Sequence, residues 1–246
     1  MAPDTELDPT RDPSAADALV RQGARSWFVK AGFGIIAYGA YLFVLAGTWR
    51  WPSAWAFLIL FLAATIAHGY LLVRTNPWLL AQRSKGLHEE GAPKWDKLVT
   101  GLAAGLLPLL SWTVAALDFR YDWSAPMAPW IQVVGAIVFV FSWMMVIWAT
   151  YANRFFTTTV RIQPGHTVQT GGPYRYVRHP GYVGSILYIL ATPFVLGSWW
   201  AVVPAAVGAL LMIVRTKLED DFLQRELDGY SEFAARVRYR LVPGAW

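Results

Sequence analysis

The sequence predicts an all-helical, polytopic membrane protein with about six spans. Of its 246 residues, 56% are hydrophobic and only 15% are charged, whereas an ordinary soluble domain carries about 25% charged residues. Several apolar runs approach the roughly 20 residues that a helix needs to cross a bilayer. The lysines and arginines are also distributed unevenly among the loops between these runs, which is typical of multi-pass proteins.

The apolar runs predict four long spans followed by a shorter helical hairpin. At 1.5 Å per residue, a segment of about 16 residues reaches about 24 Å, against about 30 Å of hydrocarbon. Thr192 and Pro193 also interrupt the first of the two short segments. We therefore expect a tight, kinked hairpin whose cytoplasmic mouth is wide enough to hold a ligand. The expected segments are 27–48, 52–73, 98–117, 127–150, 181–197 and 199–214.

The positive charges predict which ends of the spans face the cytoplasm. Nineteen of the 21 lysines and arginines fall in the amino-terminal region, the segments 74–97 and 151–179, and the tail from Arg215. Only Arg50 and Arg120 fall on the other side. Because cytoplasmic loops carry the excess of lysine and arginine, both termini are expected in the cytoplasm. We expect the membrane to be the cytoplasmic (inner) membrane of a bacterium.

Three parts of the chain follow from this layout. Residues 1–24 form a polar, flexible tail without the apolar core of a signal peptide, residues 25–150 form a four-span bundle, and residues 151–246 carry the chemistry. The net charge of +5 fits loops on an anionic membrane face better than nucleic-acid binding. With no cysteine and only 4 scattered histidines, neither a disulfide framework, a thiolate nucleophile nor a metal site is expected.

The stretch 171–184, GGPYRYVRHPGYVG, concentrates turn-forming, aromatic and basic residues directly before an apolar run. The glycines and proline at 171–173 signal a turn. Pro180 falls where a helix can begin, because proline is tolerated in the first helical turn. The free N–H groups of such a helix would face the loop and attract an anion. Since His179 lies in this dense polar cluster, the sequence predicts a polar pocket beside the membrane.

A second polar cluster begins where the last apolar segment ends. Arg215 and Glu219 are one helical turn apart and share a face if the helix continues. Ionisable residues at the end of a membrane helix often serve only as interfacial anchors, and this explanation stays open for Lys217 and Asp221. Further along, apolar residues at helical spacing predict an amphipathic tail helix on the membrane or over the pocket. These residues are Leu218, Phe222, Leu223, Leu227, Tyr230, Phe233 and Val237.

The two clusters together resemble the isoprenylcysteine carboxyl methyltransferase family. The resemblance rests on GHTVQTGGPYRYVRHPGYVG and, about thirty apolar residues later, on RTKLEDDFLQRELDGYSEFAARVRYRLVPG. It covers about 153–246, whereas the first four spans are generic. The wider superfamily also holds phospholipid N-methyltransferases, thiol methyltransferases and membrane sterol reductases. Family members often show paired glutamates, where this chain has Glu219 and Asp220.

The resemblance implies an integral-membrane enzyme that takes a methyl group from S-adenosylmethionine. A sulfonium cation suits aromatic faces and carboxylates, and the methionine carboxylate suits Arg178, His179 or the helix start at Pro180. The candidate catalytic residues are Arg215, to orient an acidic acceptor group, and Glu219, to close the site. The cofactor-binding residues that the resemblance implies are His166, Val168, Gly172, Pro173, Tyr174, Arg178, His179, Pro180, Tyr182 and Glu219.

The expected partners are membrane lipid and a lipophilic acceptor, either a small molecule or a prenyl- or lipid-linked carboxylate or thiol. The acceptor atom stays open between oxygen, sulfur and nitrogen. An alternative is an NADPH-dependent membrane reductase of the sterol-reductase type, whose phosphates would meet Arg154, Arg161, Arg175 and Arg178. A third is a non-enzymatic transporter or scaffold. The spans argue against it, because they hold almost no ionisable residue beyond His68, whereas transport paths usually carry some.

Overall fold

The computed structural model describes residues 13–88 and 91–246, and every regular element within them is helical. The predicted all-helical bundle is confirmed. Residues 1–12, which begin the predicted polar tail, lie outside the described residues. The elements are α1 (Pro13–Ala46), α2 (Pro52–Thr75), α3 (Pro77–Arg83), η1 (Gly86–His88), α4 (Lys94–Thr100), η2 (Gly101–Leu106), α5 (Leu107–Tyr121), α6 (Pro129–Ala152), η3 (Gly172–Arg175), α7 (Pro180–Leu196), α8 (Val202–Glu226) and α9 (Tyr230–Arg236).

Four of the described helical stretches are long and apolar enough to cross a membrane, in agreement with the four predicted long spans. The third is continuous through α4, η2 and α5, and η2 is a π-helical stretch within it. The first helix starts earlier than expected, so the part of the predicted tail from Pro13 onward is helical. The candidate spans cover 20–46, 52–75, 94–121 and 129–152.

The closing hairpin differs from its prediction in where its helices end. Helix α7 is short, with 17 residues, and Pro193 lies inside its last turn without ending it. Helix α8 does not stop at residue 214 but continues for 25 residues to Glu226, a length of about 37 Å. Its apolar first half and charged second half form one rod, because residues 215–226 keep the apolar spacing of a helix. The polar residues of the second half are therefore positioned by the membrane part.

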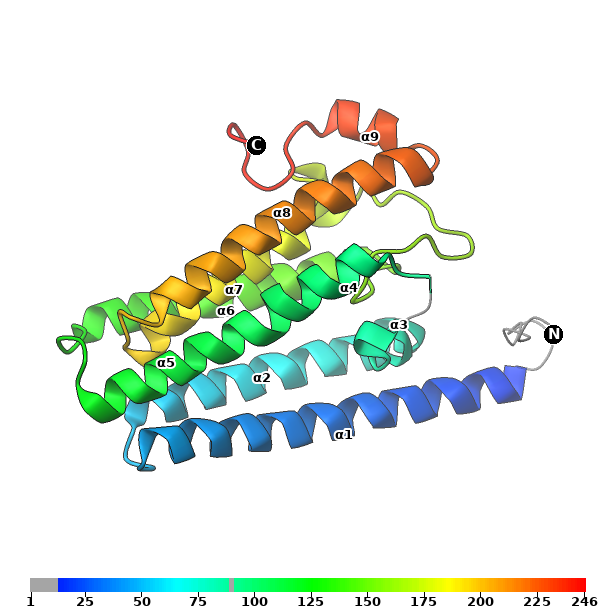
Figure 1. The fold of residues 1–246 in the computed structure, drawn as a ribbon. Helices are drawn as coiled ribbons and strands as arrows, with labels where there is room; N and C mark the ends of the chain where they lie inside the picture. Colours follow the sequence, from blue (N-terminus) through cyan, green and yellow to red (C-terminus); the bar gives the residue numbers. More distant parts are fainter. Residues whose placement is uncertain (1–12, 89–90) are drawn as a thin grey trace.

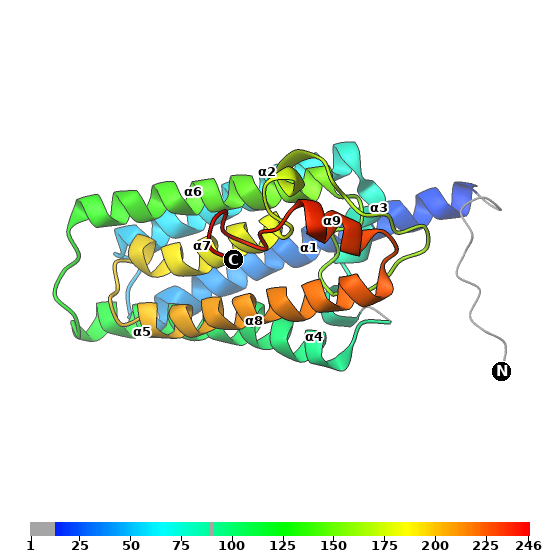
Figure 2. The ribbon, with the colours of Figure 1, turned by 90° about the horizontal axis from the view of Figure 1, so that it is seen from above.

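Helix α7 lies between α6 and α8 in the view from above (Figure 2). Gly184 allows the close approach of α7 to α6, since a Cβ there would lie 2.7 Å from the carbonyl oxygen of Ser142. Farther along the bundle, aromatic rings of three helices form the core: Phe57 meets Trp112 edge-on at 5.4 Å and Phe139 at 5.8 Å between ring centroids. The close approach at Gly184 thus holds the first half of α7 tightly against the second half of α6.

Helix α3, the 153–179 segment and α9 gather at one end of the bundle (Figure 1). The predicted amphipathic tail is divided between the end of α8 and α9, with Gly229 between them at a φ of +79°. Its apolar residues do not lie free: Leu227, Tyr230 and Phe233 pack against Tyr174 and Ala149 in a separate buried cluster. The tail therefore caps this end of the bundle, which is one of the two placements expected for it.

Candidate functional site

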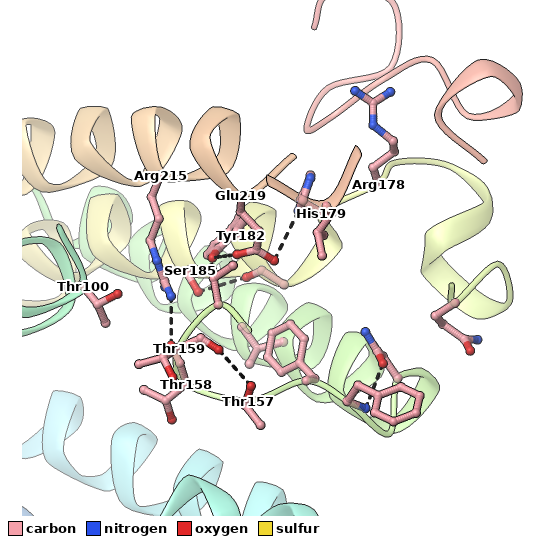
Figure 3. A pocket seen from close by; sticks show the side chains of 18 of the residues that line it. Thr100, Thr157, Thr158, Thr159, Arg178, His179, Tyr182, Ser185, Arg215 and Glu219 are labelled. Atoms are coloured by element: carbon pink, nitrogen blue, oxygen red, sulfur yellow. Dashed lines mark hydrogen bonds and ion pairs between the residues drawn. The ribbon is translucent and has the colours of Figure 1, made fainter. Parts of the chain in front are cut away.

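A cavity of about 320 Å³ lies at the end of the bundle where the 153–179 segment, the start of α7, the second half of α8 and α9 meet. Its volume falls within the range of small-molecule sites. Polar side chains from the 153–179 segment, α7 and α8 line one half (Figure 3). The other half runs between the membrane helices and is lined mainly by Ala104, Pro108, Trp143, Val146, Tyr188, Ile189 and Met212.

Asp220 is the centre of a buried polar cluster beside this cavity. Its side chain is fully buried, and its carboxylate accepts hydrogen bonds from Nε and Nη2 of Arg178 at 2.7 and 2.9 Å. Nε2 of His179 lies 3.0 Å from the same carboxylate. The Tyr230 hydroxyl and Nε of Arg240 donate to it at 3.0 and 2.9 Å. One carboxylate therefore joins the loop, α7, α8, α9 and the tail.

The polypeptide after α9 completes this cluster. The third nitrogen of Arg178, Nη1, donates to the carbonyls of residues 237–238 at 2.7 and 2.8 Å. The backbone N–H groups of Arg178 and His179 donate to the carbonyls of residues 239–240 at 2.9 and 3.0 Å. In Figure 3 the Arg178 side chain points toward this tail and away from Glu219. All three guanidinium nitrogens of Arg178 thus have protein partners.

Burial and hydrogen bonding set the ionisation of this cluster. Burial alone would raise the pKa of Asp220, but hydrogen bonds from His179 and Arg178 hold that pKa well below its usual range. Burial, together with the charge of Asp220, raises the pKa of Tyr230 above its ordinary value. The carboxyl group is therefore ionised and the phenol neutral at physiological pH, which is the combination that their hydrogen bond requires.

Glu219, the neighbour of Asp220 on α8, faces the cavity instead. Its side chain is 22% exposed, and its carboxylate accepts a hydrogen bond from the Tyr182 hydroxyl. Its Oε1 lies 3.9 Å from Nδ1 of His179, whose ring stacks on that of Tyr182 with centroids 5.7 Å apart (Figure 3). A carboxylate, an imidazole and a phenol therefore meet at the cavity wall where α7 begins.

Arg215 connects this wall to the third span. Its Nε donates to the fully buried Asp96 at 2.8 Å, and its Nη2 donates to the carbonyl of Thr158 at 2.9 Å. The guanidinium carbon lies 5.1 Å from the centroid of the Tyr182 ring. Arg215 is thus fixed by protein partners through two nitrogens, and it packs on the same tyrosine that donates to Glu219.

The 153–171 segment forms the opposite wall of the polar half. The side-chain oxygen of Asn153 accepts from the backbone N–H of Phe155 at 2.9 Å, and its nitrogen lies 3.4 Å from the Tyr174 hydroxyl. The His166 ring packs on Phe155 with centroids 4.5 Å apart. Burial lowers the pKa of His166 below its ordinary value, so this histidine is neutral at pH 7.

The residues expected to bind the cofactor or act on the acceptor divide into lining and supporting positions. Gly172 and Pro173 form the turn that leads to Tyr174, and the φ of +57° at Gly172 favours glycine. Pro180 is the first residue of α7, so the predicted helix start is confirmed. The expected residues that line the cavity are His166, Val168, Tyr174, Arg178, His179, Tyr182, Arg215 and Glu219.

Sequence reasoning missed several residues that organise the site. Asp220 was noted in the acidic pair without a role of its own, and Tyr230 was assigned only to an apolar pattern. Asp96 and Arg240 were not singled out. An aspartate directly before the third span was the one available signal for Asp96, because a carboxylate at a span end needs a partner. In the described ranges, no three histidine or acidic side chains are placed to hold a metal ion.

Comparison with known proteins identifies the part of the chain that contains this site. Residues 130–228 match the family model described as phospholipid methyltransferase. The match runs from the start of α6 to just beyond α8, and it includes Tyr182, Arg215, Glu219 and Asp220. No curated protein matches the chain. The region 130–228, which contains most of the site, is therefore similar to the phospholipid methyltransferase family, a group of membrane methyltransferases.

Proposed function

We propose that the protein transfers a methyl group from S-adenosylmethionine to a lipophilic acceptor at the cytoplasmic face of the membrane. One observation carries the proposal. A single cavity joins a polar wall at the start of α7 to an apolar interior between the membrane helices, within a region that matches a methyltransferase family. Such a cavity suits a polar cofactor at one end and an apolar substrate at the other.

The side chains of the polar half fit the chemistry of S-adenosylmethionine. The Glu219 carboxylate, with the aromatic rings of Tyr182 and Tyr230 in the cavity lining, suits a sulfonium cation. The imidazole of His179 and the first turn of α7 suit the methionine carboxylate. When bound, the cofactor supplies an electrophilic methyl carbon.

The protein contributes mainly orientation and exclusion of water. The Tyr182 ring is held by the Glu219 carboxylate at its hydroxyl and by the Arg215 guanidinium over the ring, so its position in the cavity wall is fixed. Arg215 lines the cavity, and its charge suits an acidic acceptor group. An ionised thiol or carboxylate needs no base, and for a neutral acceptor Glu219 is the carboxylate placed to accept the proton.

The arrangement of arginines favours this function over an NADPH-dependent reductase. Arg154 and Arg175 do not line the cavity; the guanidinium of Arg154 packs over the Phe155 ring at 4.6 Å, and Arg175 is exposed. The guanidinium of Arg178 is hydrogen-bonded to Asp220 and to the polypeptide after α9. Of the four expected arginines only Arg161 and Arg178 line the cavity, so a pyrophosphate with a 2′-phosphate would meet half of the expected cations at this site.

The cytoplasmic placement of the site is part of the proposal. Its support is the excess of positive charge, nineteen of 21 lysines and arginines, in the segments expected on that side. The 153–179 segment, α9 and the tail also lie together at one end of the bundle (Figure 1). Both termini and the cofactor pocket are thereby assigned to the compartment that contains S-adenosylmethionine.

Direct binding tests the proposal. The purified protein in lipid nanodiscs is titrated with S-adenosylmethionine, with its demethylated product and with NADPH by calorimetry. We expect saturable binding of the first two and none of NADPH. Transfer of a radiolabelled methyl group into the lipid-extractable fraction is the second readout. Binding of NADPH without S-adenosylmethionine would reject the methyltransferase and support the reductase.

A further inference from the structure

Two polar atoms in the apolar half of the cavity have no hydrogen-bond partner within the described part of the chain. They are Nε2 of His68, on α2, and Nε1 of Trp143, on α6. Both side chains line the cavity, and their ring centroids are 6.1 Å apart. His68 is only 3% exposed. The two atoms thus belong to neighbouring groups that face the same space.

The surroundings of this pair are apolar and lie within the membrane bundle. The Trp143 ring packs against Tyr188 at 5.9 Å and against Phe61 at 5.9 Å between centroids. His68 precedes the end of α2 at Thr75 by seven residues, which places it about 10 Å inside that end. Both atoms are buried without a hydrogen-bond partner, and an unpaired polar group in such a place costs free energy.

The chemistry of the two side chains defines what would satisfy them. An indole N–H only donates, so the matching group must carry a lone pair. Nε2 of a neutral imidazole either accepts or donates, depending on the tautomer. A hydroxyl oxygen can accept from Trp143 and donate to His68, and a carbonyl oxygen can accept from both. A methyl or methylene group can do neither.

We infer that His68 and Trp143 bind an oxygen atom carried within the apolar body of the acceptor. This inference rests on the proposed function and narrows its substrate class. An acceptor whose membrane-embedded part is pure hydrocarbon, such as a simple prenyl chain, leaves both atoms unpaired. A ring hydroxyl, a ring carbonyl or a lipid ester carbonyl pairs them. The pair is thus a specificity-determining element that joins His68 on α2, outside the region that matches the methyltransferase family, to Trp143 on α6, within that region.

Binding of matched apolar probes tests the inference without relying on turnover. Radiolabelled 4-decylphenol and decylbenzene differ only in a hydroxyl group, and binding is measured to protein-loaded nanodiscs with empty nanodiscs as the partition control. Net hydrogen bonds contribute about 1 kcal/mol each, so with two of them we expect the phenol to bind about thirtyfold more tightly. His68→Phe and Trp143→Phe each remove one of the two hydrogen bonds, so each should lower this preference about fivefold while leaving decylbenzene binding unchanged.

A matched variant on the same helix separates recognition from general effects on α2. Tyr70 is 58% exposed and does not line the cavity, so Tyr70→Phe removes a hydroxyl without touching the pair. It should keep the full preference for the phenol. Equal binding of the two probes to the wild-type protein would overturn the inference, and so would equal losses of the phenol preference in His68→Phe and Tyr70→Phe. Bound water would then be the partner of both atoms.

The source of the oxygen is resolved by competition. Diester and diether phosphatidylethanolamine with identical chains are compared as competitors of 4-decylphenol. Stronger competition by the diester assigns the oxygen to a lipid ester carbonyl, and equal competition assigns it to a ring-borne oxygen. A failure of S-adenosylmethionine binding would reject the proposed function alone, because these binding measurements contain no cofactor.

Discussion

Glu219 and Asp220 are adjacent on α8, yet their surroundings are opposite. Successive residues of a helix point about 100° apart, so the two carboxylates face different parts of the molecule. The Asp220 side chain is completely buried among partners from four segments, whereas that of Glu219 is 22% exposed at the cavity wall. The difference indicates that Asp220 holds this end of the bundle together and that Glu219 is available to a ligand.

The largest expected effect is on stability, in Asp220→Asn. The substitution leaves the buried guanidinium of Arg178 without its counter-charge, and breaking a buried ion pair in this way costs about 3–5 kcal/mol. We expect a markedly lower thermal unfolding midpoint in detergent, measured by circular dichroism. Proteolysis between residues 226 and 246 should also become faster, because the tail is held through the same cluster.

The next residue provides the control for this prediction. Asp221 forms an ion pair with Lys217, whose side chain is 60% exposed, and surface pairs of this kind contribute between about 0 and 1 kcal/mol. Asp221→Asn should therefore unfold close to the wild-type temperature. Similar midpoints for the two variants would show that Asp220 is not the structural centre of the site.

A smaller effect, on binding rather than stability, is expected in Glu219→Gln. The substitution keeps the shape of the side chain but removes the charge that faces the cavity. Loss of one charged interaction costs about 1.5–3 kcal/mol, so the affinity for S-adenosylmethionine should fall roughly ten- to hundredfold. Calorimetric titration of the purified variant measures it, and the unfolding midpoint should stay near that of the wild type.

Glu226→Gln, at the exposed end of α8, is the matched control and should bind the cofactor normally. If Glu219→Gln lowered the unfolding midpoint as far as Asp220→Asn does, the two carboxylates would share one structural role. Unchanged cofactor affinity in Glu219→Gln would remove Glu219 from the proposed cofactor site.

The fold could be predicted from the sequence where single segments decide it. The lengths of the apolar runs predicted the long spans, and Pro180 predicted the start of α7. The apolar segment 199–214 did not define the end of α8, because a helix does not stop where its residues become polar. Residues 215–226 continue it, and their partners come from elsewhere in the chain.

The site could be predicted only as a set of candidate residues. Which of Glu219 and Asp220 meets the cavity depends on the rotation of α8 against α7, which no local pattern encodes. The partner of Arg215 is Asp96, 119 residues away, and the partners of Arg178 include the tail. His68 was noticed as an ionisable residue within the spans, but its pairing with Trp143 requires the packing of α2 on α6.

The smallest expected effect is a change of stability with pH, and it further tests the contrast between Asp220 and Glu219. The pKa of Asp220 is lower in the folded protein than in the unfolded chain, where an aspartate titrates near pH 4. Its contribution to stability is therefore complete above about pH 4 and is lost as the pH falls below that value toward the folded pKa.

The measurement compares the unfolding midpoints of the wild type and Asp220→Asn between pH 6 and pH 3. Each pH unit below the unfolded pKa removes at most about 1.4 kcal/mol, so the wild-type advantage should shrink only slightly, by roughly 1 kcal/mol at pH 3. Carboxyl groups common to both proteins largely cancel in the difference. An advantage that grows below pH 4 would mean that folding favours the protonated carboxyl group. Asp220 would then not be the charged centre of the buried cluster, and the distinction between Asp220 and Glu219 would be lost.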